Sequence, residues 1–255
     1  MTQRVFLTGA SSGIGTALAH AYAARGAKLG LVARRGDALH ALAASLNCET
    51  LVCSADVRSD AEVQQAAELF LARFGTPDVV IANAGVSHGT ATEQAADLAT
   101  FAEIMDTNAL GMVRTFQPFV TAMRRAKQGR LVGIASVAGF RGLPGSGAYS
   151  ASKAAAITYL ESLRIELRGS GVSVATICPG YISTPMTEKN SYSMPFIMPS
   201  EQAAKKILSA IDGGRTFYVF PWQMAWIGKI MRVLPNPLFD TLAAKSGRKP
   251  RKSPS

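Results

Sequence analysis

The feature that most constrains the fold is near the N-terminus, where an apolar run ends in a cluster of glycines. Val5–Thr8 is typical of a buried strand, the turn Gly9-Ala-Ser-Ser-Gly-Ile-Gly15 follows, and Thr16–Arg25 has helical apolar spacing. Glycine lets the backbone turn sharply, and a helix N-terminus offers free N–H groups and partial positive charge to phosphates. No Lys-Ser/Thr pair follows the glycines, so the pattern favours a dinucleotide site over a nucleoside-triphosphate loop.

The rest of the chain continues this alternation of strand and helix. The strand-like runs are apolar throughout, which indicates a parallel sheet with helices on both faces and a single α/β domain. The expected strands are residues 5–8, 28–33, 50–53, 78–82, 130–135, 172–177 and 216–220. The expected helices are 16–25, 37–46, 61–74, 98–127, one from 149 to about 168, and 201–211 with Ser200 as its cap. Asn108 falls in the middle of a helix, where we expect it to face solvent.

A second group of residues predicts proton transfer. Ser136 ends the fifth strand, and the following loop leads into a helix that carries Tyr149 and Lys153. Residues four apart share a helix face, so the Lys153 ammonium is expected beside the Tyr149 hydroxyl, where a cation lowers the pKa of the phenol. The Ser136 hydroxyl is placed to bind the same reacting oxygen. These three groups suit the interconversion of an alcohol and a carbonyl.

Two positions bear on the nucleotide. At the end of the second strand of such folds an acid binds the ribose hydroxyls, whereas an arginine accommodates a 2′-phosphate. Here Ala33 holds that position and Arg34 and Arg35 follow, which predicts NADP(H) in preference to NAD(H). The alternative is two solvated arginines at a helix start. Asp56 either accepts from an adenine amino group or caps the helix after Ser59.

Taken together, these motifs resemble the classical short-chain dehydrogenase/reductases. The resemblance covers about residues 4–220, and Tyr149 lies thirteen positions after Ser136, as the family pattern requires. It is carried by Thr8-Gly-Ala-Ser-Ser-Gly-Ile-Gly15, Asn83-Ala-Gly85, Asn108, Ser136, Tyr149-Ser-Ala-Ser-Lys153 and Pro179-Gly180 with Thr184. The resemblance implies a Rossmann-type, doubly wound, three-layer fold with a seven-stranded parallel sheet of order 3-2-1-4-5-6-7.

The resemblance also implies roles for individual residues. Tyr149 would be the acid/base, Lys153 would lower its pKa and bind the nicotinamide ribose, Ser136 would polarise the carbonyl, and Asn108 would hold a water in a proton relay. Hydride would pass between the nicotinamide and the carbonyl carbon. The implied cofactor-binding residues are Thr8, Gly9, Ser11, Ser12, Gly13, Ile14, Gly15, Arg34, Asp56, Val57, Asn83, Ala84, Gly85, Tyr149, Lys153, Pro179, Gly180, Ile182 and Thr184.

The substrate side is less defined by sequence. Residues 181–200, here called the lid, are rich in methionine and aromatic side chains, which make an adaptable apolar wall. They suggest an apolar or bulky ketone, although the same residues would also suit a loop packed on the domain. His88 either lines the pocket or is a solvated loop residue. A non-catalytic NADP(H)-binding regulator is the alternative function, and an epimerase or dehydratase would need a longer substrate domain.

The C-terminal part differs in charge from the domain. Eight basic residues and one acid, Asp240, follow Asp212, so most of the net charge of +10 lies there. Residues 1–220 form the expected catalytic domain, 221–244 an amphipathic helical extension, and 245–255 a basic, disordered tail. The apolar face of the extension (Trp222, Trp226, Ile230 and Val233) is expected to pack on its own or a partner subunit. The alternative is peripheral contact with an anionic membrane.

Composition bounds the setting and the partners. The apolar start has only the length of a strand, so no signal peptide is expected, and three cysteines without metal-like spacing fit the cytoplasm. The Ala154–Ala156 run allows close helix packing, and we expect a homodimer or homotetramer. The other expected partner is a small-molecule carbonyl or alcohol, with no specific nucleic acid and no metal.

Overall fold

The computed structural model describes residues 2–244 and 247–252. Its main sheet has seven parallel strands in the order β3-β2-β1-β4-β5-β6-β9, which confirms the predicted topology. The seventh strand is numbered β9 because the lid contributes two short strands, β7 and β8, that pair with each other outside the main sheet. The strands are β1 Arg4–Thr8, β2 Lys28–Ala33, β3 Thr50–Ser54, β4 Val79–Ala82, β5 Gly129–Ile134, β6 Val172–Pro179, β7 Ile182–Ser183, β8 Met198–Pro199 and β9 Phe217–Phe220.

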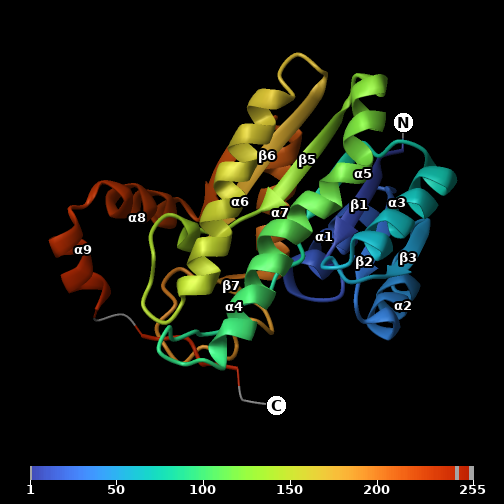
Figure 1. Cartoon of the computed structure of the whole chain (residues 1–255). Helices are drawn as coiled ribbons and strands as arrows, with labels where there is room; N and C mark the ends of the chain where they lie inside the picture. The colour runs from blue at the N-terminus through green and yellow to red at the C-terminus, as the bar shows by residue number, and fades with distance from the viewer. Residues whose placement is uncertain (1, 245–246, 253–255) are drawn as a thin grey trace.

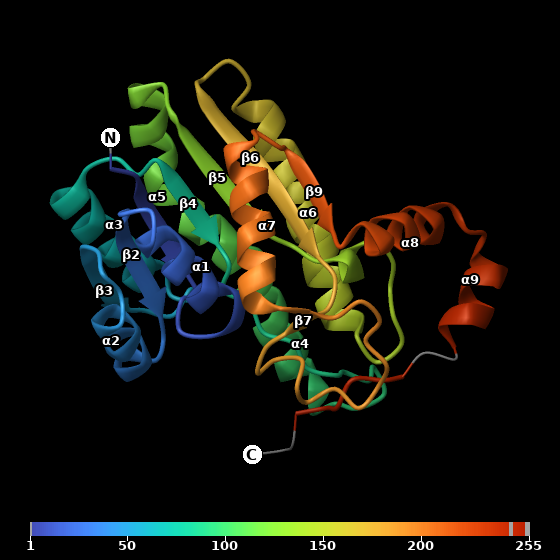
Figure 2. The ribbon, with the colours of Figure 1, turned by 180° about the vertical axis from the view of Figure 1, so that it is seen from behind.

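Helices cover both faces of this sheet (Figure 1). Figure 2 shows α1, α2 and α7 on one face, and α3, α5 and α6 cover the other. The α-helices are α1 Gly13–Ala23, α2 Gly36–Ala44, α3 Asp60–Phe74, α4 Asp97–Met105, α5 Gly111–Ala126, α6 Gly147–Glu166, α7 Ser200–Asp212, α8 Trp222–Val233 and α9 Asn236–Ala243. A π-helical turn, η1 (Asp106–Leu110), joins α4 to α5, and a short 3₁₀ turn, η2 (Val137–Gly139), follows β5.

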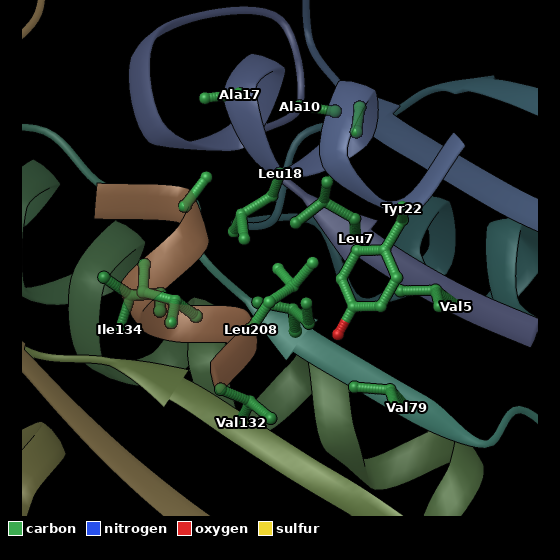
Figure 3. Packing of buried hydrophobic residues seen from close by; sticks show 14 of the residues in the cluster. Val5, Leu7, Ala10, Ala17, Leu18, Tyr22, Val79, Val132, Ile134 and Leu208 are labelled. Carbon is green, nitrogen blue, oxygen red and sulfur yellow. The ribbon is translucent and has the colours of Figure 1, made fainter. Parts of the chain in front are cut away.

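Two apolar layers hold the helices on the sheet. Figure 3 shows Leu18 and Tyr22 of α1 and Leu208 of α7 packed over Leu7 and Val79. Because these side chains are almost completely buried, α1 is fixed directly behind the glycine turn. On the other face three phenylalanines, Phe6, Phe70 and Phe119, form a cluster with ring centroids 4.7 to 6.0 Å apart, in which Phe70 meets the other two rings edge to face.

The structure corrects two expectations about helices. The predicted helix 98–127 is interrupted by η1, which contains Asn108, and Asn108 is only 1% exposed instead of facing solvent. Ser200 does not cap α7, because Pro199 is the N-cap residue and the Ser200 hydroxyl donates to Glu201 Oε1. The cap of α3, in contrast, is Ser59, whose hydroxyl accepts from the Glu62 N–H at 3.3 Å.

The C-terminal extension consists of two helices that project from the domain (Figure 1). The face that was expected to pack is solvent-exposed: Trp222, Trp226, Ile230 and Val233 are 55 to 81% exposed. Met224 and Gly228, on the opposite side of α8, are the residues that face the domain. Packing of the predicted face on its own subunit is therefore wrong. None of the described helices is long and apolar enough to cross a membrane.

After α9 the chain returns beneath the carboxyl ends of the strands, as both views show (Figures 1 and 2). Residues 247–252, which belong to the segment expected to be disordered, make defined contacts with the domain. The Gly89 N–H donates to the Pro250 carbonyl at 2.8 Å, and Arg251 is paired with Asp97 at 2.8 Å. The remaining residues of the predicted tail, 245–246 and 253–255, lie outside the described part.

Candidate active site

The carboxyl ends of β1, β2, β4, β5 and β6 meet at one cavity of about 360 Å³. Most of the residues predicted to bind cofactor or to catalyse line this cavity. Thr8, Gly15 and Asn108 are the predicted residues that do not line it. The lining residues that the sequence did not single out as site residues are Ala33, Arg35, Ala55, Val86, Thr107, Ile134, Ala135, Pro185, Met186 and Thr187.

The glycine turn has a shape that side chains would prevent. Gly9 has a φ of +67°, and a Cβ there would lie 2.7 Å from the backbone of Ala84. The Asn83 amide donates to the carbonyls of Thr8 and Gly9, each at 3.1 Å, and thereby ties the turn to the end of β4. Asn83 therefore orders the turn in addition to lining the cavity. Thr8 is buried beneath the turn, and Gly15 lies against the Gly9 carbonyl, where a Cβ would clash.

This turn fits the diphosphate of a dinucleotide. Helix α1 begins at Gly13, and its N-cap Ser12 makes no side-chain cap bond. The first N–H groups of a helix have no partners within the helix, and they favour negative charge. Ser11, Ser12, Gly13 and Ile14 all line the cavity at this point. The arrangement satisfies the geometric and electrostatic needs of a bound diphosphate.

The end of β2 presents two arginines with different surroundings. Arg35 donates to the Ser11 carbonyl at 3.0 Å and to its hydroxyl at 3.3 Å, so it braces the glycine turn. Within residues 2–244 and 247–252, the Arg34 guanidinium has no hydrogen-bond or ion-pair partner, although it lines the cavity. Arg34 is thus the cation available to an anionic group at this end.

Asp56 lies opposite, at the end of β3. Its carboxylate accepts three side-chain bonds from Arg58 at 2.6 to 3.1 Å, and these bonds hold its pKa below the ordinary value. The alternative that Asp56 caps α3 is wrong, because Ser59 provides the cap. The carboxylate still lines the cavity, but much of its accepting capacity is already used by Arg58.

The proton-transfer residues converge at the other end of the cavity. Ser136 lies two residues after β5, where it caps η2, and is 8% exposed, and α6 places Tyr149 and Lys153 in the lining of the same cavity. Burial raises the pKa of Tyr149, and a hydrogen bond with Ser136 opposes that rise. The three side chains therefore surround one position where a substrate oxygen can lie.

Lys153 does not behave as the sequence predicts. Its amine donates to the Ile134 carbonyl at 2.8 Å and lies 5.9 Å from the centre of the Tyr149 ring. Burial lowers the pKa of Lys153 to about 8, and the charge of Lys249 adds to this shift. The expected lowering of the Tyr149 pKa is not found, because burial of the phenol outweighs its hydrogen bond with Ser136.

Asn108 acts as a brace behind the site. Its Oδ1 accepts from the Val86 N–H at 2.8 Å, and its Nδ2 donates to the Val86 carbonyl at 2.9 Å and to the Ser152 hydroxyl at 3.0 Å. It therefore joins the loop after β4 to helix α6, one residue from Lys153. The π turn brings this side chain inward, and helical periodicity alone gave no signal of it.

The first part of the lid lines the same cavity as the glycine turn and Tyr149, and a Cβ at Gly13 would lie 2.8 Å from the Thr184 side chain. Met186 and Thr187 line the cavity, and the Thr187 hydroxyl closes the start of the lid by donating to the Ile182 carbonyl at 2.6 Å. The rings of Tyr181 and Tyr192 meet edge to face, with centroids 6.3 Å apart. His88 does not line the cavity. It is partly buried, and its pKa is lowered by burial and by nearby lysines.

Comparison with known proteins agrees with this geometry. The family model described as short chain dehydrogenase matches residues 3–194. An uncharacterized oxidoreductase of Myxococcus xanthus is 40% identical over 94% of this chain and 95% of its own. The 11-beta-hydroxysteroid dehydrogenase-like 2 protein of Arabidopsis thaliana is 33% identical over 91% of this chain and 78% of its own.

A solved structure gives the same result at the level of the fold. An alcohol dehydrogenase from the archaeon Thermococcus sibiricus, complexed with 5-hydroxy-NADP, has a TM-score of 0.76 and is 27% identical. The match covers 86% of this chain and 96% of that one. The chain belongs to the short-chain dehydrogenase/reductase family. It is an oxidoreductase that acts on alcohol or carbonyl groups.

Proposed function

We propose that the protein is an NADP(H)-dependent oxidoreductase that interconverts a carbonyl and a secondary alcohol, with Tyr149 as acid/base. The observation that carries this proposal is the shared cavity. The glycine turn and Arg34 line one end of it, while Ser136, Tyr149 and Lys153 line the other. A nucleotide bound across the carboxyl ends of the strands would bring its reactive ring next to the tyrosine hydroxyl.

The residues of the chain divide the work around one substrate oxygen. A bound nicotinamide supplies or accepts the hydride. In the direction of reduction, the Tyr149 hydroxyl gives its proton to the carbonyl oxygen, and in oxidation it takes the proton back. Ser136 donates a hydrogen bond to the same oxygen and fixes its position. Lys153, with a pKa of about 8, can return a proton to the site near neutral pH.

Preference for NADP(H) is supported by Arg34. Its guanidinium has no hydrogen bond or ion pair among the described residues, and the Asp56 carboxylate, on which its charge acts, is hydrogen-bonded to Arg58. A cation that is free to bind phosphate favours the 2′-phosphorylated nucleotide, because charge-assisted bonds are the stronger ones. The ligand of the Thermococcus sibiricus relative is of the same type.

An apolar or bulky substrate is supported by the lid. Met186 reaches the cavity and Tyr181 and Tyr192 stand next to it, so the wall is mostly apolar and adaptable. The name of the Arabidopsis thaliana relative refers to a hydroxysteroid, which is a large apolar alcohol. We therefore expect ketones or secondary alcohols with an apolar body.

The test is a pair of tyrosine variants on one helix. Tyr149→Phe should lower turnover of NADPH with reactive diketones or quinones by about 10²–10⁴-fold, because a positioned acid contributes that much. Its dissociation constant for NADPH should stay within about twofold. Tyr159→Phe makes the same chemical change nearly three turns further along α6 and should retain activity.

Three outcomes would contradict the proposal. Near-normal turnover in Tyr149→Phe would remove Tyr149 as the acid/base. Equal losses in Tyr149→Phe and Tyr159→Phe would point to damage to the helix. A wild-type chain that binds NADPH but oxidises it with no carbonyl compound would favour the non-catalytic regulator.

Assembly into a homodimer or homotetramer is part of this proposal. The outer faces of α4 and α6 carry exposed apolar side chains, Leu98 at 74% and Ile165 at 62%, which a second subunit could cover. Light scattering coupled to size-exclusion chromatography should give two or four times the mass of 26.9 kDa. A monomer at micromolar concentration would contradict it.

We also propose that a partner subunit covers the exposed apolar face of α8. The rival occupant is an anionic membrane, to which Lys229 and Arg232 would be attracted. Co-sedimentation with anionic liposomes at low salt, lost in a Trp222→Ser/Trp226→Ser variant, would support the membrane and exclude the partner.

A cytoplasmic location is supported by three free cysteines, Cys48, Cys53 and Cys178.

A further inference from the structure

The chain after α9 forms part of the substrate side of the site. We call residues 247–252 the strap. It lies against the loop after β4, where the Gly89 N–H binds the Pro250 carbonyl, and against the lid, where Gly247 meets the side chain of Tyr192. A Cβ at Gly89 would lie only 2.3 Å from the Lys249 carbonyl. The strap is therefore in direct contact with both walls that flank Tyr149.

Lys249 is the strap residue that reaches the catalytic tyrosine. Its amine lies 4.3 Å from the centre of the Tyr149 ring, closer than the amine of Lys153 at 5.9 Å. The same amine donates to the Ser87 hydroxyl, which leaves two of its three N–H donors for other partners. Lys249 thus stands beside Tyr149, next to the place where the proposed function puts the substrate.

The charge environment of Lys249 differs from that of Arg251 and Lys252 on the same strap. Of the strap cations, Arg251 is paired with Asp97 and Lys252 with Glu103, each at 2.8 to 2.9 Å. In the described part of the chain no carboxylate is paired with Lys249. A partly buried cation without a counter-ion is unfavourable unless a ligand supplies the negative charge.

Neighbouring groups increase this excess of positive charge. Lys249 lowers the pKa of Lys153 on one side and that of His88 on the other. Lys189 of the lid and Lys252 also act on His88, and Glu103 opposes them. Since Glu103 is already paired with Lys252, an anion arriving here would meet a positive potential.

We propose that Lys249 binds a carboxylate carried by the carbonyl substrate. This inference rests on the proposed function and narrows the substrate class to oxo acids, or the matching hydroxy acids, whose apolar body lies under the lid. Lys249 would act as a specificity-determining residue, holding the anionic end while the carbonyl oxygen lies at Tyr149 and Ser136. The observation that carries it is the ammonium beside the tyrosine ring, which has no carboxylate partner among the described residues.

The experiment uses matched acids and esters. Phenyl ketones with one to four methylene groups between carbonyl and carboxylate are compared with their methyl esters, using the full chain and NADPH. Wild type should favour the acid at one spacing or more. Lys249→Met should lower the acid-to-ester ratio of kcat/KM by about 10- to 100-fold, the usual worth of a charge-assisted bond. Lys249→Arg should keep most of the preference.

A second variant of the same strap serves as the matched control. Lys252→Met also removes one lysine charge, but this lysine is paired with Glu103, and the acid-to-ester ratio should stay within about twofold of wild type. Lys249→Gln is measured as well, with thermal unfolding of every variant, so that a folding defect in Lys249→Met does not decide the result.

The outcomes separate this inference from the proposed function. If wild type reduces the esters as well as the acids at every spacing, the role of Lys249 is wrong while the reductase assignment stands. Equal losses on acid and ester in Lys249→Met and Lys249→Gln also overturn it, because they indicate a structural contact. If wild type reduces no ketone at all, the proposed function itself fails, and the inference with it.

Discussion

The glycine turn lines the same cavity as Tyr149, and the strap reaches the ring of that tyrosine through Lys249, but the two segments are held in place by different forces. The turn is fixed by its backbone, since Gly9 adopts a φ of +67° and lies against the backbone of Ala84. The strap is attached mainly by side-chain charges: Arg251 and Lys252, 45% and 49% exposed, pair with Asp97 and Glu103. Because the basic side chains of these pairs are about half exposed, salt screens the pairs in part.

The difference in how the turn and the strap are held matches their two tasks, which are binding the nucleotide and admitting the substrate. A bound nucleotide is large and is recognised by close backbone approach, which requires a preformed and rigid turn. The substrate side is closed by two segments far from each other in sequence, the lid and the strap, joined to the domain by few main-chain bonds. Regions with few buried apolar contacts and exposed hydrogen bonds open at low cost. We infer that substrates enter and leave on the strap side while the nucleotide end stays fixed.

The largest effect is expected from a side chain at Gly9. Gly9→Ala combines a left-handed φ with a contact of 2.7 Å to backbone, so it should lower the free energy of unfolding by about 3 kcal/mol. It should also raise the NADPH dissociation constant at least about tenfold, measured by nucleotide fluorescence, because the turn moves.

Gly26→Ala is the matched control for this change. Gly26 has a similar φ of +71°, but a Cβ there meets nothing within 4 Å. It should lose only about 1 kcal/mol of stability and keep its affinity for NADPH. Equal effects of the two substitutions would show that the nucleotide end is not defined by close backbone contact.

A smaller effect is expected at the same end from Arg34→Ala. Loss of the unpaired guanidinium should lower the ratio of kcat/KM for NADPH over NADH by about 10- to 100-fold. Arg35→Ala removes the bonds to Ser11 and should weaken both nucleotides alike. A ratio that is unchanged in Arg34→Ala but falls in Arg35→Ala would transfer the phosphate-binding role to Arg35.

The same contrast explains what the sequence could predict. The nucleotide end depends on short motifs directly after strands, so the parallel topology alone brings Gly9, Asn83, Ser136 and Pro179 to one cavity. The inward position of Asn108 depends on a π-helical turn, and such a turn produces no periodic pattern of apolar residues that would reveal it in the sequence. The place of Lys249 depends on a contact between residues 87 and 249. Residue 249 belongs to the tail 245–255, whose positive charge and polar composition suggested disorder. Position along the chain does not reveal such long-range pairing.

A modest effect is expected when the strap loses an anchor. Arg251→Gln removes the charge pair with Asp97, which is the bidentate contact of the strap. Hydrogen exchange of the Gly89 amide, whose N–H donates to the Pro250 carbonyl, should become several-fold faster. Arg248→Gln, on the same strap but without an ion pair in the described residues, should leave this exchange rate unchanged. Equal protection in both variants would mean that main-chain contacts alone hold the strap.

The smallest expected effect is a pH-dependent change in stability caused by the charge of Lys249. It tests whether the strap, unlike the nucleotide end, carries an unbalanced charge. Burial lowers the pKa of Lys249 from 10.5 to about 8. Between these values the unfolded chain binds more protons than the folded one, so stability rises with pH. Below pH 8 both states carry the charge, and the folded protein bears the full cost of burying it. Lys249→Met should therefore unfold a few degrees above wild type at pH 7, and this gap should narrow as the pH is raised from 8 towards 10.5.

Removal of an exposed lysine from α7 controls for the change in net charge. Lys205→Met leaves the strap untouched and should show no such narrowing in calorimetric scans over the same pH range. The sign of the gap is decisive: a Lys249→Met protein that is less stable than wild type at pH 7 would show that the ammonium is already well paired. The strap would then resemble the nucleotide end, as a fixed part of the fold with no unbalanced charge to offer a substrate.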